Sequence, residues 1–404
     1  MASEQTDDSE QGWDRWLLLI VLLLVALGLI MLYSSSAVMA EQRMGGHLVL
    51  LQNQLQKVVL GMVLLTGALC VDYRWYKRMI YPMLIGTVVL LVLVLIPGIG
   101  IIQNGAQRWF SLGGMSFQPA EVAKVTAVMY LAYSVSKKGK RMGSFTIGFV
   151  PHLLVIGFMV GLLMLQPDFG SSVMLLALMM ILLFVSGAKL SYLFMFTLTG
   201  AVGAYFAISG SEYRMKRILA FLDPWSHRQD IGYQISESLI AIGASGLYGR
   251  GLGNGTGKLG YVPELWNDFI GTIIAEELGI FGIVFLAGLF ALLVWRGLRI
   301  AFRCDDPFGM YLAFGITAMF GLQAMANLWV VTGMLPTKGL TLPLVSFGGS
   351  SMIMGLFAIG VLLNISRNAP DHWELEREER DGERLERRWE KKREKIMRSR
   401  DRRR

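Results

Sequence analysis

Three groups of polar residues lie inside or beside apolar stretches of the 404-residue sequence, where an ionisable side chain is costly. The first group starts at Asp268 and continues with Glu276 and Glu277. Asp268, Thr272 and Glu276 are four apart, so a helix would place them on one face. A carboxylate at Asp268 can take a proton from a substrate, or it can simply cap the helix. A cap does not explain Glu276 and Glu277, which either serve a site or bind backbone groups or an arginine.

The second group, from Gln118 to Lys124, opens a helix with proline at its first position. Glu121 and Lys124 are three apart and share a helical face, so they can form an ion pair that makes both charges tolerable. Alternatively, this face lines a polar cavity that also receives Arg108 from the preceding loop. Arg108 is followed by Trp109, and this pair is equally compatible with an anchor at a membrane interface.

The third group lies in predicted turns. Asp168, in the sequence Gln166-Pro167-Asp168-Phe169-Gly170, is either a turn residue or the cap of the helix that follows. Alternating glycines from Gly249 to Gly257 allow tight turns and a close approach to a phosphate, with Lys258 ready for an anion. The segment 255–260 has the spacing GxGxxG, but it follows no predicted strand, so we do not predict dinucleotide binding.

The composition indicates which elements must position these groups. Residues of the set AVILMFWYC make up 54% of the chain and charged residues only 17%, and 26 of the 68 charged residues lie between Ser366 and Arg404. The rest of the chain is too apolar for a soluble enzyme, a disordered chain or a nucleic-acid-binding domain with a basic face. We therefore predict an all-α polytopic membrane protein.

About ten apolar runs approach the roughly twenty residues that a helix needs to cross a hydrocarbon core. The short loops on one side hold 11 Lys and Arg and those on the other side three, so the positive-inside rule places both termini in the cytoplasm. One large extracytoplasmic loop, about 210–268, is predicted between spans seven and eight. The predicted domains are a cytoplasmic segment 1–15, a membrane domain 16–366 and a charged, helical cytoplasmic tail 367–404. The predicted spans are 16–40, 55–71, 79–97, 119–136, 146–165, 171–187, 190–209, 269–295, 307–331 and 343–365.

Several motifs follow one another along the chain, and their combination is specific. They are Arg108-Trp109, Gln118-Pro119-Ala120-Glu121 with Lys124, Gln166 to Gly170, Tyr233-Gln234-Ile235, Gly249 to Gly253, Val262-Pro263-Glu264, Asp268-Phe269-Ile270, Glu276 to Gly279, Asn327, Leu335 to Pro343 and Ser346 to Ser351.

With these motifs, the sequence from about Trp16 to Arg367 resembles the SEDS family of bacterial cell-envelope polymerases. The segment 337–341 is more similar to the division branch of that family than to its elongation branch. Two departures lie next to Asp268: Trp266-Asn267 stands where the family usually has His-Thr, and Gly271 where an aromatic residue is expected.

The resemblance implies a peptidoglycan glycosyltransferase that uses lipid II, an undecaprenyl-pyrophosphate-linked disaccharide-pentapeptide. Pyrophosphate leaves well once its charge is neutralised, so a single carboxylate can suffice as general base, and we assign this role to Asp268. Electrostatic stabilisation of the pyrophosphates is assigned to Arg108, Lys124, Lys258 and Lys338, with Glu121 holding Lys124 in place.

Further residues are expected to contribute to the site. Gln118 and Asp168 are predicted to contact the substrate, and Glu276, Glu277 and Asn327 to support it. A divalent cation, Mg or Mn, could share in neutralising the pyrophosphate, with Asp268 or Glu277 among its ligands. No organic cofactor is expected.

The resemblance also implies partners and a location. The partners are a class B penicillin-binding protein whose transpeptidase cross-links the product, other membrane proteins of the division complex, lipid II with the undecaprenyl-linked growing glycan, and membrane lipids; nucleic acid is not among them. The expected location is the bacterial cytoplasmic (inner) membrane at the division septum. Two other functions stay open, a lipid II flippase and a non-catalytic scaffold that recruits a division transpeptidase.

Overall fold

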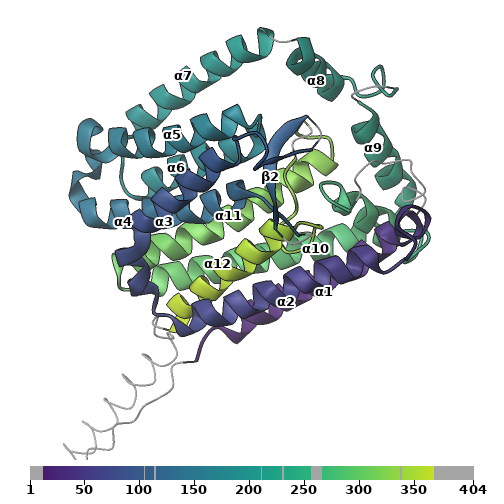
Figure 1. The fold of residues 1–404 in the computed structure, drawn as a ribbon, viewed down its shortest axis with the longest axis horizontal. Coiled ribbons are helices and arrows are strands. Elements are labelled where there is room, and N and C mark those ends of the chain that lie inside the picture. Colours follow the sequence, from purple (N-terminus) through teal and green to yellow (C-terminus); the bar gives the residue numbers. More distant parts are fainter. Residues whose placement is uncertain are drawn as a thin grey trace, which may run out of the picture.

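The computed structural model describes residues 12–103, 105–112, 115–210, 212–229, 232–255, 266–336 and 339–367. Most of this part of the chain is helical (Figure 1). Lys258, Lys338, most of the predicted segment 1–15 and nearly all of the predicted tail lie outside the described residues. The elements are α1 (Arg15–Met44), α2 (Val49–Cys70), α3 (Tyr73–Leu93), β1 (Ile101–Gln103), β2 (Ala106–Leu112), β3 (Met115–Phe117), α4 (Pro119–Lys138), α5 (Val150–Leu165), α6 (Phe169–Val185), α7 (Leu190–Ser209), α8 (Glu212–Leu222), α9 (Tyr233–Ser245), α10 (Ile270–Arg303), α11 (Pro307–Val331) and α12 (Gly349–Arg367).

Each predicted span overlaps one helix, which confirms the predicted helical, polytopic fold. Helices form because a membrane offers no water to satisfy backbone N–H and C=O groups. Among the described residues, seven helices are long and apolar enough to cross a membrane, and α6 and part of α7 are shorter apolar helices. The charged α4 is in neither group. The number of ten crossings therefore stays a prediction.

The first and last described helices meet at one end of the bundle, called here the terminal end. The backbone N–H of Asp14 donates to Oγ of Ser366 (3.0 Å), and Arg296 near the end of α10 forms an ion pair with Asp14 (2.6 Å). The starts of α3 and α11 are linked there by the ion pair between Lys77 and Asp306 (2.9 Å). The helices α4, α10 and α12 begin toward the opposite end, called the distal end.

Glycines allow the backbone of a helix to approach the backbone of another helix or of a connecting segment. A Cβ at Gly360 of α12 would lie 2.4 Å from the carbonyl oxygen of Leu65 in α2. A Cβ at Gly28 of α1 would lie 2.6 Å from the carbonyl oxygen of Val345. Small residues at such contacts are a usual means of packing membrane helices, because they increase van der Waals contact.

The sequence prediction did not include the small sheet between α3 and α4. Its strands run antiparallel in the order β1-β2-β3, with Phe110 paired to Phe117 and their rings stacked 6.5 Å apart. The strands β1 and β3 have only three residues each, too few to show an alternating pattern. The sheet carries Arg108 on β2, where the prediction had only a loop.

Two departures from helical structure lie at the distal end. The helix α10 is broken at Gly279 (φ 70°, ψ −160°), a backbone conformation that favours glycine. The helix α12 begins at Gly349, six residues after the predicted start of the last span at 343, because the preceding segment turns through Leu344 at φ 64°. Both departures leave non-helical backbone beside the candidate site, which a membrane tolerates only where protein or a polar cavity surrounds it.

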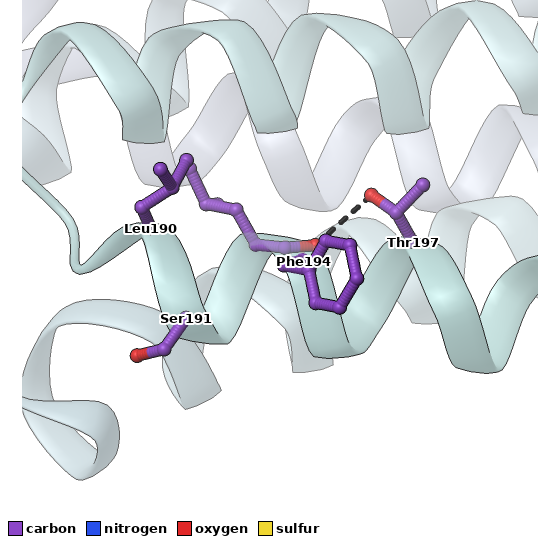
Figure 2. A pocket seen from close by; sticks show the side chains of 5 residues that line it. Leu190, Ser191, Phe194 and Thr197 are labelled. Carbon is purple, nitrogen blue, oxygen red and sulfur yellow. Dashed lines mark hydrogen bonds between the residues drawn. The ribbon is translucent and has the colours of Figure 1, made fainter.

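The helix α7 runs along the edge of the molecule, away from most of the bundle, and leads into α8 and α9 (Figure 1). The predicted large loop therefore contains two helices within its described part. Figure 2 shows a depression at the start of α7, lined by Leu190, Ser191, Leu193, Phe194 and Thr197. No ionisable side chain lines it, so it is not a candidate for chemistry.

Candidate active site

Asp268 is positioned by Asn327 at the distal end. Asp268 directly precedes Phe269, the N-cap residue of α10. Asn327 of α11 donates from Nδ2 to the carbonyl oxygens of Asp268 (2.8 Å) and Leu340 (2.7 Å). One amide thus joins the start of α10 to the segment 339–341. Its own Oδ1 is buried and has no hydrogen-bond partner within the described chain.

The carboxylate of Asp268 faces the segment 339–341. A Cβ built on Gly339 would lie 3.5 Å from Oδ2 of Asp268. The side chain is half-buried, so it is accessible from outside while its backbone is fixed. A base must be held in this way if it is to meet a substrate hydroxyl in one orientation.

Glu121 and Lys124 are connected to the same segment through Gln323. Nζ of Lys124 lies 2.8 Å from Glu121 and donates to Oε1 of Gln323 (3.2 Å). Nε2 of Gln323 donates in turn to the carbonyl oxygen of Thr341 (3.0 Å). The Lys124 side chain is only 2% exposed, so its charge is compensated by Glu121 rather than by water.

The structure therefore brings together Asp268, Asn327, Glu121 and Lys124, which the sequence singled out separately. It adds Gln323, which the sequence prediction missed. Gln323 and Asn327 are four apart on the otherwise apolar α11, so they lie on one face, and this spacing was the available signal.

Arg108 and Asp168 form a neighbouring polar cluster. Arg108 donates from Nε to the carbonyl oxygen of Gln166 (2.8 Å) and from Nη2 to that of Pro167. Asp168 accepts from the backbone N–H and hydroxyl of Ser171 (3.1 and 2.8 Å), so it caps α6, one of the two roles considered for it. A substrate contact of Arg108 or Asp168 stays a prediction.

Gln118 links this cluster to α12. Its Nε2 donates to Asp168 (3.2 Å), and its backbone N–H donates to Oγ of Ser350 (2.7 Å). The starts of α4, α6 and α12 are thereby held against one another. A substrate contact of Gln118 likewise stays a prediction.

Glu277 binds the glycine-rich loop. Its carboxylate accepts from Oγ of Ser34 (2.6 and 2.7 Å) and from the backbone N–H groups of Gly253 (3.0 Å) and Gly255 (3.3 Å). The expectation that this loop approaches a phosphate is therefore wrong for these two N–H groups, because a carboxylate of the protein already occupies them.

Glu276 also has partners within the protein. It forms an ion pair with Arg250 (3.3 Å), and its backbone carbonyl accepts from the N–H of Arg250 (3.0 Å). Thr272, one turn earlier, shares a hydrogen bond with Ser238 of α9 (2.6 Å). On the predicted face that begins at Asp268, Thr272 thus packs against α9 and Glu276 against the loop that follows α9. Of the two interpretations of Glu276 and Glu277, the contacts favour partners for backbone and arginine.

A divalent cation shared by Asp268 and Glu277 does not fit these contacts. Glu277 is enclosed by N–H and O–H donors, and it lies seven residues, or about 10 Å, beyond the first residue of α10. The described residues contain no group of three or more His, Cys, Asp or Glu side chains that could hold a metal ion. A cation bound at Asp268 without Glu277 stays a prediction.

These features define a class of protein: a polytopic membrane protein with a polar site at one end of its helix bundle, where charged side chains form ion pairs and loops are held by hydrogen bonds to side chains. Residues 14–370 match the family described as cell cycle protein, which is named for FtsW, RodA and SpoVE. The chain belongs to this family, and the resemblance to the SEDS family is confirmed.

Relatives of known name match most of the chain. The "Probable peptidoglycan glycosyltransferase FtsW" of Geobacter sp. (strain M18) is 42% identical over 88% of this chain and 97% of its own. Stage V sporulation protein E of Bacillus subtilis (strain 168) is 40% identical over 88% of this chain and 97% of its own.

Solved structures show the same fold. A chain from "Structural coordination of polymerization and crosslinking by a peptidoglycan synthase complex" has a TM-score of 0.75 and 30% identity, covering 88% of this chain and 98% of its own. The rod shape determining protein RodA of Thermus thermophilus has a TM-score of 0.67 and 29% identity, covering 89% and 98%.

Proposed function

We propose that Asp268 is the general base of a glycosyl transfer at the distal end of the bundle. The chain is a peptidoglycan glycosyltransferase of the FtsW type that polymerises glycan strands in cell division, as the names of its relatives and its extensive identity with them indicate. The attachment of Asp268 supports its role: Asn327 fixes its backbone, and its carboxylate faces the segment 339–341.

In this reaction the 4-hydroxyl of lipid II attacks the anomeric carbon of the growing, lipid-linked chain. The new bond joins the hydroxyl oxygen to that carbon, and the bond from the carbon to the pyrophosphate oxygen breaks with inversion. Asp268 accepts the hydroxyl proton, and undecaprenyl pyrophosphate leaves. A leaving group with stabilised negative charge needs no acid, so a second catalytic carboxylate is not required.

Cations at the distal end stabilise the charge that develops on the pyrophosphate. Lys124 is held by Glu121 and Gln323 behind the segment 339–341, and Arg108 is held by the 166–167 turn. Preorganised cations lower the barrier because they need not reorient during the reaction. Lys258 and Lys338 are proposed to complete this set, and Gln118 and Asp168 to shape its border.

We further propose that the distal end faces outward from the cytoplasmic membrane, with both termini inside, at the division septum. The basic loops counted in the sequence support this orientation. A class B penicillin-binding protein is the proposed partner, and the similarity to a chain of a peptidoglycan synthase complex supports it. Other division proteins and membrane lipids complete the proposed surroundings.

Reconstitution tests the assignment of Asp268. The full chain, purified with its penicillin-binding partner, is given labelled lipid II, and glycan chains are separated on gels. Asp268→Ala and Asp268→Asn should lower polymerisation by about 10²–10⁴-fold. Asp223→Ala, which removes an exposed carboxylate in the loop after α8, is the matched control and should polymerise normally. Normal polymerisation by Asp268→Ala would contradict the assignment.

The same preparation distinguishes the other functions. A flippase would move labelled lipid II across the bilayer without forming polymer. A scaffold would do neither, while its partner's cross-linking would still depend on its presence. Lys124, Gln323 and Asn327 are hydrogen-bonded to one another or to backbone of the distal end, which favours a fixed site over a path through the bundle.

A further inference from the structure

A lysine buried in α2 has no counter-ion within the described part of the chain. Lys57 lies eight residues after the start of α2, about 12 Å along the helix, and is only 6% exposed. Its Nζ lies 4.1 Å from the centroid of the Phe347 ring. Among the described residues it has no hydrogen bond and no ion pair. Because a cation at this depth is costly, the groups it faces indicate its purpose.

The stem of Lys57 packs against the N-terminus of α12. Its Cε lies 3.2 Å from the position that a Cβ would take at Gly349, the first residue of α12, and the carbonyl oxygen of Ser116 lies 3.1 Å from the same position. The first backbone bond of this helix runs from the N–H of Met352 to the carbonyl of Gly348 (3.1 Å). The N–H groups of residues 349–351 therefore have no acceptor in the described structure. A helix of 19 residues that begins in this way favours an anion at its N-terminus.

Gln54 adds another unsatisfied atom on the same face of α2. It lies three residues before Lys57, is 2% exposed, and donates from Nε2 to the carbonyl oxygen of Ser346 (3.4 Å). Its Oε1 is buried without a partner among the described residues. A lysine ammonium, free helix N–H groups and one acceptor fit an oxyanion that brings a hydroxyl group or water with it.

This position adjoins the candidate active site without belonging to it. Ser350 of α12 accepts from the N–H of Gln118, and Ser351 shares a hydrogen bond with Oγ1 of Thr341 (3.3 Å). The start of α12 therefore contacts Lys57 directly and the network of Lys124 through Thr341. Unlike Lys124, Lys57 forms no ion pair with a carboxylate among the described residues, so an anionic ligand would supply its counter-ion.

We propose that Lys57 and the N-terminus of α12 bind the pyrophosphate of a polyprenyl-linked substrate or product, at a subsite separate from Arg108 and Lys124. The identity of this lipid rests on the proposed function. The charge and the N–H groups recognise phosphate oxygens, and the position of Lys57 within a membrane helix suits a ligand whose chain stays in the bilayer.

Binding of a short polyprenyl pyrophosphate tests the proposal. The full chain in neutral detergent is titrated calorimetrically with geranylgeranyl pyrophosphate and with geranylgeraniol, which lacks the charge. The pyrophosphate should bind at least about tenfold more tightly than the alcohol and at two sites, one of them formed by Arg108 and Lys124, and Lys57→Met should remove the other site. Lys57→Arg keeps the charge and should retain both sites. Lys140→Met removes an exposed lysine outside α2 and should bind as the parent does.

Three results would overturn the proposal. An unchanged number of pyrophosphate sites in a folded Lys57→Met protein would show that Lys57 does not bind the anion, and a single pyrophosphate site in the parent would show that no second site exists. Equally effective competition by phosphatidylglycerol would assign the site to phospholipid headgroups. If Lys57→Met does not fold, Lys57→Gln, which is neutral but polar, is measured in its place.

The test separates this proposal from the assignment of Asp268. Asp268→Ala should bind geranylgeranyl pyrophosphate as tightly as the parent while it loses polymerisation. Lys57→Met should polymerise lipid II with a raised KM and a largely retained kcat. If the Asp268 assignment is wrong, Asp268→Ala will polymerise lipid II normally, but the binding results for the Lys57 variants will be unchanged.

Discussion

Two asparagines bind backbone groups of neighbouring segments at opposite ends of the bundle. Asn327 donates to Asp268 and Leu340 at the distal end. Asn364 donates to the carbonyl of Leu69 (2.7 Å) and accepts from the N–H of Tyr73 (2.9 Å) at the terminal end. Both are buried, and only Asn327 contacts the candidate site. Comparing substitutions of these two residues therefore distinguishes an effect on the position of the catalytic base from an effect on the stability of the fold.

Asn327→Ala should reduce polymerisation through kcat. Loss of the amide frees the backbone of Asp268, and misplacement of a reacting group by about 1 Å can cost roughly 10²-fold. KM should stay close to the parent value, because the cations are untouched. Asn364→Ala and Asn327→Ala should lower the free energy of unfolding by similar amounts, about 1–3 kcal/mol, but Asn364→Ala should keep the parent kcat. Equal losses of kcat in both variants would reduce Asn327 to a structural residue.

Substitutions of Glu121 and Lys124, which form an ion pair, should have non-additive effects on the stability of the protein. Lys124→Met leaves a carboxylate without its cation at a largely buried position, which costs about 3–5 kcal/mol, whereas Lys124→Met with Glu121→Gln removes both charges and should recover most of that loss. Thermal unfolding in detergent measures the recovery. Polymerisation should stay low in the double variant if Lys124 serves the pyrophosphate, and its return would assign the pair to folding alone.

At the scale of elements, apolar runs predicted the helices but not their interruptions. The break of α10 at Gly279 and the late start of α12 were not predicted, because hydropathy averaged over a span does not show the backbone conformation of single residues. The sheet that carries Arg108 was missed because its outer strands are too short. These irregular parts nevertheless position the site, since a regular helix leaves no backbone free to bind side chains.

The break in α10 should depend on glycine. A Cβ at Gly279 would lie 2.4 Å from the carbonyl oxygen of Leu247 and from the backbone nitrogen of Gly249, at φ 70°. Gly279→Ala should therefore separate the glycine-rich loop from α10 and lower both the melting temperature and polymerisation. Gly288→Ala, in the same helix with nothing within 4 Å of its added Cβ, should be neutral or slightly stabilising. A tolerated Gly279→Ala would mean that the loop adapts without this contact.

At the scale of the whole molecule, the candidate site is assembled from helices that are distant in the sequence. The types of Asp268, Glu121, Lys124 and Asn327 were evident from the sequence, but their connection was not. It depends on Gln323 and on the carbonyl groups of residues 340 and 341. Every residue has a backbone carbonyl group, so the sequence does not show which of them will accept a hydrogen bond from a side chain. The orientation of this assembly in the membrane sets which substrate can reach it.

Cysteine labelling tests that orientation. Cys70 is exposed at the terminal end of α2 and Cys304 is buried, so Cys304→Ser leaves one reporter there. Gln229→Cys, in a background with both natural cysteines replaced by serine, places a reporter in the exposed turn between α8 and α9. A membrane-impermeant maleimide should label the Gln229→Cys protein in intact spheroplasts and Cys70 only after permeabilisation, because the basic loops keep the terminal end inside. The reverse pattern would put Asp268 on the cytoplasmic face, where a polymerase of exported, lipid-linked glycan could not work.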